Sequence, residues 1–254
     1  METFEYENYC SVCLDAVNNP TSFSNFKNNP TYKTILEHVS PQQGSDYLKL
    51  IQQNSLYDKI NWKDIIKNDN LGSPITFNYT INDKQYDISP TTLRYVYYGL
   101  QILQFLKEIK NTTPNIIEIG GGYGGQCYIL TVLSKLFEIN ISKYVILDLK
   151  EVTLLQNKYL QELNTPVDYK CYTLEQIEII KNANNFVVSN YAFSELDNLT
   201  QNQYLDKVIN NSTSGYLVWN TQEGYEKFFP NRKIIVETEI PLTGPNNKIV
   251  KYIY

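Results

Sequence analysis

The sequence predicts an α/β protein in which a mostly parallel sheet ends in an antiparallel hairpin and follows an N-terminal helical extension. Three observations predict this fold class. Strand-like and helix-like segments alternate from Asn115 onward, the last two strand-like segments are closely joined, and residues 1 to about 110 hold mainly helical patterns. We therefore expect a helical, substrate-covering region at 1–110 and a sheet domain at 111–254.

The N-terminal region contains short helical patterns interrupted by prolines, and then one long pattern. The short patterns read TYKTILEHV, SDYLKLIQQN and WKDIIKN. The long one, SPTTLRYVYYGLQILQFLKEIK, opens with a Ser/Thr-Pro capping signal, and its leucines recur at helical spacing. We expect this last helix of the region to pack onto the sheet domain.

The sheet domain shows five strand-like segments separated by helical ones. The strands are NIIEI, KYVILDL, VDYKCY, NNFVVSN and SGYLVWN, and helical patterns follow the first, second and fourth of them. This alternation indicates parallel βαβ units. Two further strand patterns, RKIIVETEI and NKIVKYIY, are separated only by PLTGPN, which is too short for a parallel crossover and predicts an antiparallel pair.

Composition argues against several classes of protein. The net charge is −5 and the pI is near 5.1, whereas nucleic-acid-binding proteins usually carry a basic surface. The N-terminus shows no signal-peptide pattern, and no apolar run is long enough for a membrane span, so we expect a cytoplasmic location. Cys10 and Cys13 form a C-x-x-C motif without two further ligands at suitable spacing, so no metal site is expected.

The segment NIIEIGGGYGGQC, residues 115–127, is the strongest signal in the chain. Five of the 11 glycines fall within six residues, directly after a short apolar strand. The lysine of a P-loop is missing, but Gly120, Gly122 and Gly125 fit the G-x-G-x-x-G dinucleotide pattern. Glu118, just before the glycines, suits a ligand with a cationic amino-acid portion better than a pyrophosphate. It therefore favours S-adenosylmethionine over NAD(P).

Three motifs together resemble a known family. EIGGGYGGQ, followed by VILDL, SNYAFSEL and a terminal hairpin, resembles the class I SAM-dependent methyltransferases. With SPTTLRY, these motifs resemble the sugar O-methyltransferases within that superfamily, over roughly residues 20–254. The resemblance implies a Rossmann-like sheet, S-adenosylmethionine as cofactor and a sugar or nucleotide-sugar as substrate. The activity it implies is methylation of a sugar hydroxyl in glycan biosynthesis.

The resemblance also assigns residues to the cofactor. The glycine loop and its preceding acid would line the methionine end, the acid after the second strand would hold the ribose, and the end of the third strand would flank the adenine. The residues so assigned are Glu118, Gly120, Gly122, Tyr123, Gly124, Asp148, Leu149, Tyr172, Thr173 and Asn190. The acid usual at the end of the third strand is absent here, since Glu175 lies two residues further on.

The chemistry is expected at the end of the fourth strand, because ligands bind outside the carboxyl ends of parallel strands. There we predict Glu195 as general base, with Tyr191 in the methyl-transfer channel and Asp197 and Tyr191 binding substrate. The alternative for these acids is structural: Ser194 would cap the following helix and the acids would favour its N-terminus.

Two residues of the N-terminal region are further candidates. His38, the single histidine, is a second candidate base, or else a cap at the end of its helix. Arg94 is a candidate for binding a nucleotide-sugar phosphate. A metal that orients two hydroxyls would need another carboxylate beside Asp197, and the spacing does not demand one.

Two other functions stay open at this point. One is an NAD(P)-dependent oxidoreductase, which an all-parallel, doubly wound sheet would favour. The other is a non-catalytic methyltransferase-like protein that binds a glycan or protein through the helical region. For partners we expect a small-molecule substrate, no nucleic acid and no membrane, with a homodimer as one arrangement of the chain.

Overall fold

The computed structural model describes residues 3–178, 184–220 and 224–254, and the chain forms two compact units. Unit 1 comprises residues 1–112, 122–140 and 150–166, and unit 2 comprises residues 113–121, 141–149 and 167–254. The chain passes from unit 2 to unit 1 inside the glycine loop, between Gly121 and Gly122. The division into domains at residue 110 stays a prediction.

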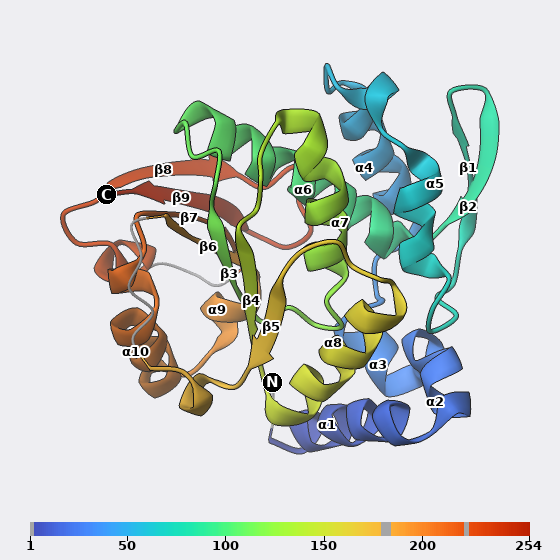
Figure 1. Ribbon diagram of the computed structural model, residues 1–254, viewed down its shortest axis with the longest axis horizontal. Coiled ribbons are helices and arrows are strands. Elements are labelled where there is room, and N and C mark those ends of the chain that lie inside the picture. Colours follow the sequence, from blue (N-terminus) through green and yellow to red (C-terminus); the bar gives the residue numbers. More distant parts are fainter. Residues whose placement is uncertain (1–2, 179–183, 221–223) are drawn as a thin grey trace. The chain divides into compact units, whose positions relative to one another are not determined.

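Unit 2 contains a seven-stranded sheet (Figure 1). The strands are β3 (Asn115–Ile119), β4 (Lys143–Leu147), β5 (Tyr169–Tyr172), β6 (Asn185–Asn190), β7 (Ser214–Trp219), β8 (Lys233–Thr238) and β9 (Lys248–Ile253). They lie in the order β5-β4-β3-β6-β7-β9-β8. The first five are parallel, and β9 is antiparallel to both β7 and β8.

This topology confirms the predicted fold class. The sheet is mostly parallel, and β9 inserts antiparallel between β7 and the edge strand β8, as the short PLTGPN connection requires. The all-parallel, doubly wound sheet that would favour an oxidoreductase is not formed. The arrangement is a Rossmann-like sheet, and the chain also has an N-terminal helical region.

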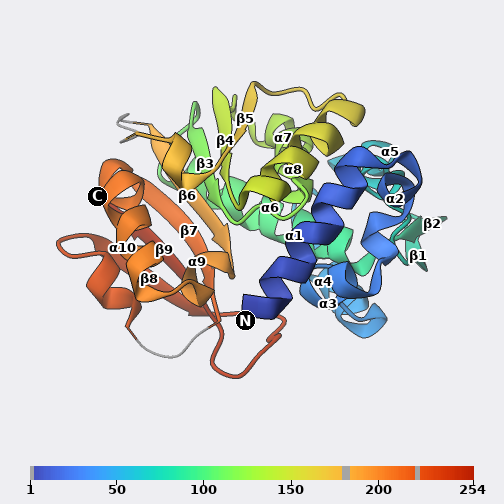
Figure 2. The same cartoon turned by 90° about the horizontal axis from the view of Figure 1, so that it is seen from below.

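One face of this sheet forms a core within unit 2. Alternate strand residues such as Ile117, Leu147 and Leu217 are buried there together with Phe193 and Tyr204. Phe193 comes from α9 (Ala192–Glu195) and Tyr204 from α10 (Asn198–Lys207), the two orange helices that follow β6 in the chain (Figure 2). The apolar run of each parallel strand is explained by this burial.

Unit 1 is mainly helical. Its helices are α1 (Thr3–Asn18), α2 (Pro20–Asn25), α3 (Pro30–Ile35), α4 (Pro41–Gln52), α5 (Trp62–Ile65), α6 (Pro90–Glu108), α7 (Gly125–Ser134) and α8 (Lys150–Glu162). Helix α6 packs on α4 and α7, and α1 packs along α8 (Figure 2). The long predicted helix is thus α6, which begins after the Ser89 cap with Pro90 at its first position.

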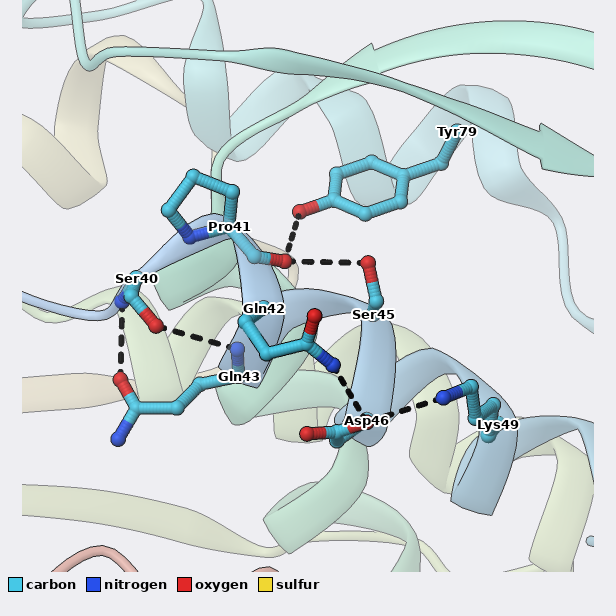
Figure 3. A network of polar contacts seen from close by, with 8 residues as sticks. All are labelled: Ser40, Pro41, Gln42, Gln43, Ser45, Asp46, Lys49 and Tyr79. Carbon is cyan, nitrogen blue, oxygen red and sulfur yellow. Dashed lines mark hydrogen bonds and ion pairs between the residues drawn. The ribbon is translucent and has the colours of Figure 1, made fainter.

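Helix α4 shows how local chemistry sets a helix start (Figure 3). The Ser40 hydroxyl accepts from the Gln43 N–H at 3.2 Å, and the Gln43 side chain accepts from the Ser40 N–H at 2.9 Å, which is a capping box. The Tyr79 hydroxyl donates to the Pro41 carbonyl at 3.4 Å. Since Tyr79 lies on β1 (Phe77–Ile81), this contact ties a hairpin to the start of α4.

That hairpin was absent from the sequence prediction. Strand β1 pairs antiparallel with β2 (Lys84–Ile88) through a turn at Asn82 and Asp83. Both turn residues have positive φ, 48° and 59°, as a two-residue hairpin turn of type I′ requires. Helices α1 and α2 were not predicted either.

Among the described residues, none of the helices combines the length and apolar character needed to cross a bilayer. In the described part of the chain, no three or more His, Cys, Asp or Glu side chains come together in a way that could hold a metal ion. Cys10 and Cys13 both lie on α1 and are not part of a disulfide.

Candidate functional site in unit 2

The carboxyl ends of the parallel strands bring several predicted residues of unit 2 to one edge of the sheet. In the strand register, Ile119 lies beside Leu147, and Leu147 lies beside Tyr172. The residues that follow these strand ends are Gly120, Asp148 and Thr173. Glu118, Gly120, Asp148, Leu149, Tyr172 and Thr173 therefore occupy three neighbouring strand ends, where ligands of open α/β sheets bind.

Gly120 makes the turn that leaves β3. Its φ is +72°, and its N–H donates to the Leu147 carbonyl at 2.9 Å. A Cβ at this position would lie 2.1 Å from the Ala192 Cβ. Both the backbone conformation and the lack of space thus require glycine here. The turn brings the chain past the end of β6, where α9 begins with Ala192.

Glu118 is a buried carboxyl directly before this turn, and only 1% of its surface is exposed. The Tyr144 hydroxyl donates to its Oε2 at 2.9 Å, and the described residues place no lysine or arginine within ion-pair distance of it. Burial, opposed by the Tyr144 hydrogen bond and reinforced by Asp148, raises the pKa of Glu118 to about 8. The site thus holds a carboxyl that still needs a cationic partner to become stable as an anion.

The ends of β4 and β5 carry both polar and apolar side chains. Asp148 accepts the Leu149 N–H on its Oδ1 at 2.9 Å, and the Leu149 side chain is 40% exposed. Tyr172 and Thr173 are half-buried, and Thr173 forms a capping box with Gln176. An exposed leucine beside a carboxylate fits the ribose and adenine assigned to these residues, because one part of that ligand is polar and the other flat and apolar.

At the end of β6, the structure shows a polar cluster that the sequence did not predict. Tyr191 has φ +71°, rare for a residue with a Cβ, and its hydroxyl donates to Glu239 Oε1 at 2.5 Å. Glu239 is fully buried after β8 and also accepts from the Thr243 N–H and hydroxyl and from the Asn247 side chain. This cluster holds the half-buried Tyr191 at the strand end.

The predicted acids of this region have visible structural roles. Glu195 is exposed and accepts a hydrogen bond from the Asn220 side chain. Asp197 caps α10, accepting from the N–H groups of Leu199 and Thr200 at 2.8 and 2.9 Å. The expectation of Ser194 as this cap was wrong, because Ser194 lies within α9 and bonds the Asn220 side chain at 2.6 Å. Asn190 is the last residue of β6 and is half-buried.

The remaining predicted residues belong to unit 1. Gly122 and Gly124 have φ values of +55° and +94°, and Gly124 precedes the first residue of α7, so N–H groups of a helix start follow the loop. Within unit 1, a Cβ on Gly122 would meet Leu36 at 3.0 Å. Tyr123 is fully buried and its hydroxyl accepts from the Asn68 side chain at 3.1 Å, so its side chain belongs to the core of unit 1.

His38 and Arg94 also lie in unit 1, close to each other. Helix α3 ends at Ile35, three residues before His38, and the His38 side chain bonds the Ile35 backbone, which supports the alternative of a cap at the helix end. Arg94 is only 8% exposed, and its Nη2 donates to the Leu36 carbonyl at 3.3 Å, so it is buried within unit 1. Partial burial, and then the positive charge of Arg94, lower the pKa of His38.

Unit 1 also buries a lysine that the sequence analysis did not single out. The Lys27 ammonium donates to the Asn68 carbonyl at 2.5 Å and to the Tyr159 hydroxyl at 2.9 Å, and lies 4.1 Å from the centre of the Tyr123 ring. Burial lowers its pKa to about 8, against the attraction of Glu37 and Asp69. Lys27 therefore fixes the Tyr123 side chain behind the second half of the glycine loop.

Comparison with known proteins finds similarity in structure only. No family model and no curated protein sequence matches the chain. Several solved methyltransferases have a similar structure. Magnesium protoporphyrin IX methyltransferase from Synechocystis, solved with bound SAM, is 12% identical, with 87% of this chain and 96% of that one covered and a TM-score of 0.46. A SAM-dependent methyltransferase from Aquifex aeolicus is 17% identical, covering 59% and 87%, with a TM-score of 0.42. Such distant likeness assigns neither substrate nor cofactor to this chain.

Proposed function

We propose that the protein is an S-adenosylmethionine-dependent O-methyltransferase that methylates a hydroxyl of a sugar or nucleotide-sugar in glycan biosynthesis. The single observation that carries the cofactor is the buried Glu118 carboxyl at the glycine turn, which lacks a cation. An ammonium group is the partner that such a carboxyl needs. The amino-acid end of S-adenosylmethionine supplies one, whereas the pyrophosphate of NAD(P) would add a like charge.

The other residues of the strand ends fit the same ligand. Asp148 would bind two ribose hydroxyls, and the exposed Leu149 would contact the flat face of the adenine. Gly120 lets the backbone pass close to the ligand. When bound, S-adenosylmethionine supplies an electrophilic methyl group on a sulfonium.

The chain's own residues then orient an acceptor hydroxyl and take its proton. The half-buried Tyr191, which follows β6 and is held by Glu239, would bind that hydroxyl. Glu195, exposed and bonded to Asn220, is the proposed base in unit 2, with His38 of unit 1 as the second candidate. The sugar acceptor itself is supported by the three motifs SPTTLRY, EIGGGYGGQ and SNYAFSEL.

The test is methyl transfer from labelled S-adenosylmethionine to a panel of sugars and nucleotide-sugars. The proposal predicts label in at least one sugar product, lost in Glu118→Ala. Binding of S-adenosylhomocysteine without transfer to any sugar would keep the cofactor and remove the sugar. Absence of binding would remove both.

A further inference from the structure

Tyr144 is the second residue of β4 and is fully buried, and its hydroxyl bonds a carboxyl of the cofactor site. It donates to Glu118 Oε2 at 2.9 Å, from β4 to the neighbouring strand β3. Tyr144 pairs in the strand register with Ile116, which lies two residues before Glu118. Its side chain therefore extends along the sheet toward Glu118 and the glycine turn. A phenylalanine would fill the same space without this bond.

The surroundings of the Glu118 carboxyl are nearly all neutral. On β6 the residue in register is Val188, and on β5 the nearest titratable group is the Cys171 thiol, whose pKa burial raises to about 12. Asp148, after β4, adds negative charge. The glycine turn packs directly on the carboxyl, since a Cβ on Gly121 would lie 3.1 Å from Glu118 Oε2.

A buried carboxylate with one hydroxyl donor and no cation is costly, so such a group binds a proton instead. In the proposed function, however, the same carboxyl faces an ammonium group and must be ionised to attract it. The two states differ by one proton, and the hydroxyl of Tyr144 can donate to the carboxyl in both.

We propose that Tyr144 is a positioning residue of the cofactor site, and that the ammonium of the ligand replaces the proton of Glu118. In the empty protein Tyr144 holds the neutral carboxyl against the glycine turn. When the ammonium arrives, the O–H bond of the carboxyl breaks, the proton leaves to solvent, and the carboxylate pairs with the cation. This inference rests on the proposed function, but it concerns binding alone and needs no acceptor substrate.

Calorimetric titration with S-adenosylhomocysteine, in two buffers of different ionisation enthalpy, tests it by counting the protons released. With the Glu118 pKa at about 8, we expect close to one proton at pH 7 and about half a proton at pH 8. The affinity should rise up to about tenfold between pH 6 and pH 7. Glu118→Gln should bind more weakly and release no proton.

Tyr144→Phe separates the hydroxyl from the ring. Without its donor the carboxyl ionises less readily, so we expect roughly tenfold weaker binding at pH 7 and more protons released at pH 8 than in the wild type. The matched control is Tyr252→Phe, which removes another buried hydroxyl of the same sheet, on β9, where it bonds Ser212. That variant should bind and release protons as the wild type does.

Each outcome decides one point. Binding with no proton released at pH 7 would overturn the exchange at Glu118 and leave the proposed function intact. Tyr144→Phe behaving as the wild type would overturn the role of Tyr144. If the folded wild type does not bind S-adenosylhomocysteine at all, the proposed function fails, and the inference fails with it.

Discussion

Glu118 and Glu239 are two carboxyl groups of unit 2 that are buried to the same extent but held very differently. Glu239 has 0% exposure and accepts from Tyr191, from the backbone and hydroxyl of Thr243, and from Asn247. Glu118 has 1% exposure and accepts from Tyr144. The first carboxyl is satisfied by the protein and organises a loop. The second is left short of partners, as expected of a group that completes its coordination with a ligand.

The largest effect is expected from removing the satisfied carboxyl. Glu239→Ala leaves donors on Tyr191, Thr243 and Asn247 without their acceptor, and we expect it to lower the free energy of unfolding by about 3 kcal/mol or more. Thermal melting should show a fall in Tm of roughly 6 °C or more. Glu178→Ala, an exposed acid of the same unit, is the control and should melt within about 2 °C of the wild type. Equal melting of the two variants would contradict the role of Glu239.

The glycine turn beside Glu118 is the next most sensitive position. Gly120→Ala forces a Cβ to 2.1 Å from Ala192 at a φ of +72°, and we expect at least about tenfold weaker binding of S-adenosylhomocysteine. The double variant Gly120→Ala/Ala192→Gly relieves the collision but keeps the strained φ. It should recover part of the affinity. Full affinity in the single variant would show that the turn has no part in binding.

Glu118 and Glu239 should respond oppositely to neutralisation. The folded-state pKa of Glu118, about 8, lies above the ordinary value of 4.5, so its contribution to stability is present below pH 4.5 and is lost as the pH rises to 8. Glu118→Gln should therefore raise Tm at pH 8, by about 2–4 °C for each kcal/mol recovered, and change it little at pH 4.5. Glu239→Gln should lower Tm at pH 8, because one amide oxygen replaces two acceptors. A lower Tm for Glu118→Gln at pH 8 would show that Glu118 is as well satisfied as Glu239.

The smallest effect is expected at Asp197, an exposed acid with an evident capping role. Asp197→Ala should lower Tm by a few degrees at most, through the lost cap of α10, and leave the affinity for S-adenosylhomocysteine unchanged. Asp197→Asn, which keeps a capping side chain, should melt as the wild type does. If methyl transfer to a sugar falls while Tm stays constant in both variants, Asp197 binds substrate as the sequence suggested.

The sheet could be predicted from the sequence because each parallel strand is buried and reads as an apolar run. Strand β3, Asn115–Ile119, has exactly its predicted bounds, and the short link before β9 fixed that strand as antiparallel. The hairpin β1–β2 was missed because its exposed faces are polar, with Tyr79 and Ile81 as its buried residues on β1. Its Asn82–Asp83 turn was the signal that could have found it.

Site residues could be predicted only where they lie within a predicted strand or directly after it. Glu118 lies within the predicted strand β3, and Gly120 and Asp148 directly follow β3 and β4, so each could be found from its strand. Tyr144 and Glu239 were missed because their partners lie 26 and 48 residues away in sequence, and only the register of the sheet and the β8–β9 connection join them. A tyrosine in the otherwise apolar KYVIL strand is the signal that could have drawn attention to Tyr144.

The central claim is that the strand ends at Glu118, Gly120 and Asp148 accept the amino-acid and nucleoside parts of S-adenosylmethionine. Calorimetric titration of the wild type with S-adenosylhomocysteine, and separately with NAD⁺ and NADP⁺, tests it most directly. The account predicts one S-adenosylhomocysteine per chain in the micromolar range and no heat of binding from either dinucleotide. Binding of NAD⁺ or NADP⁺ with none of S-adenosylhomocysteine would contradict it.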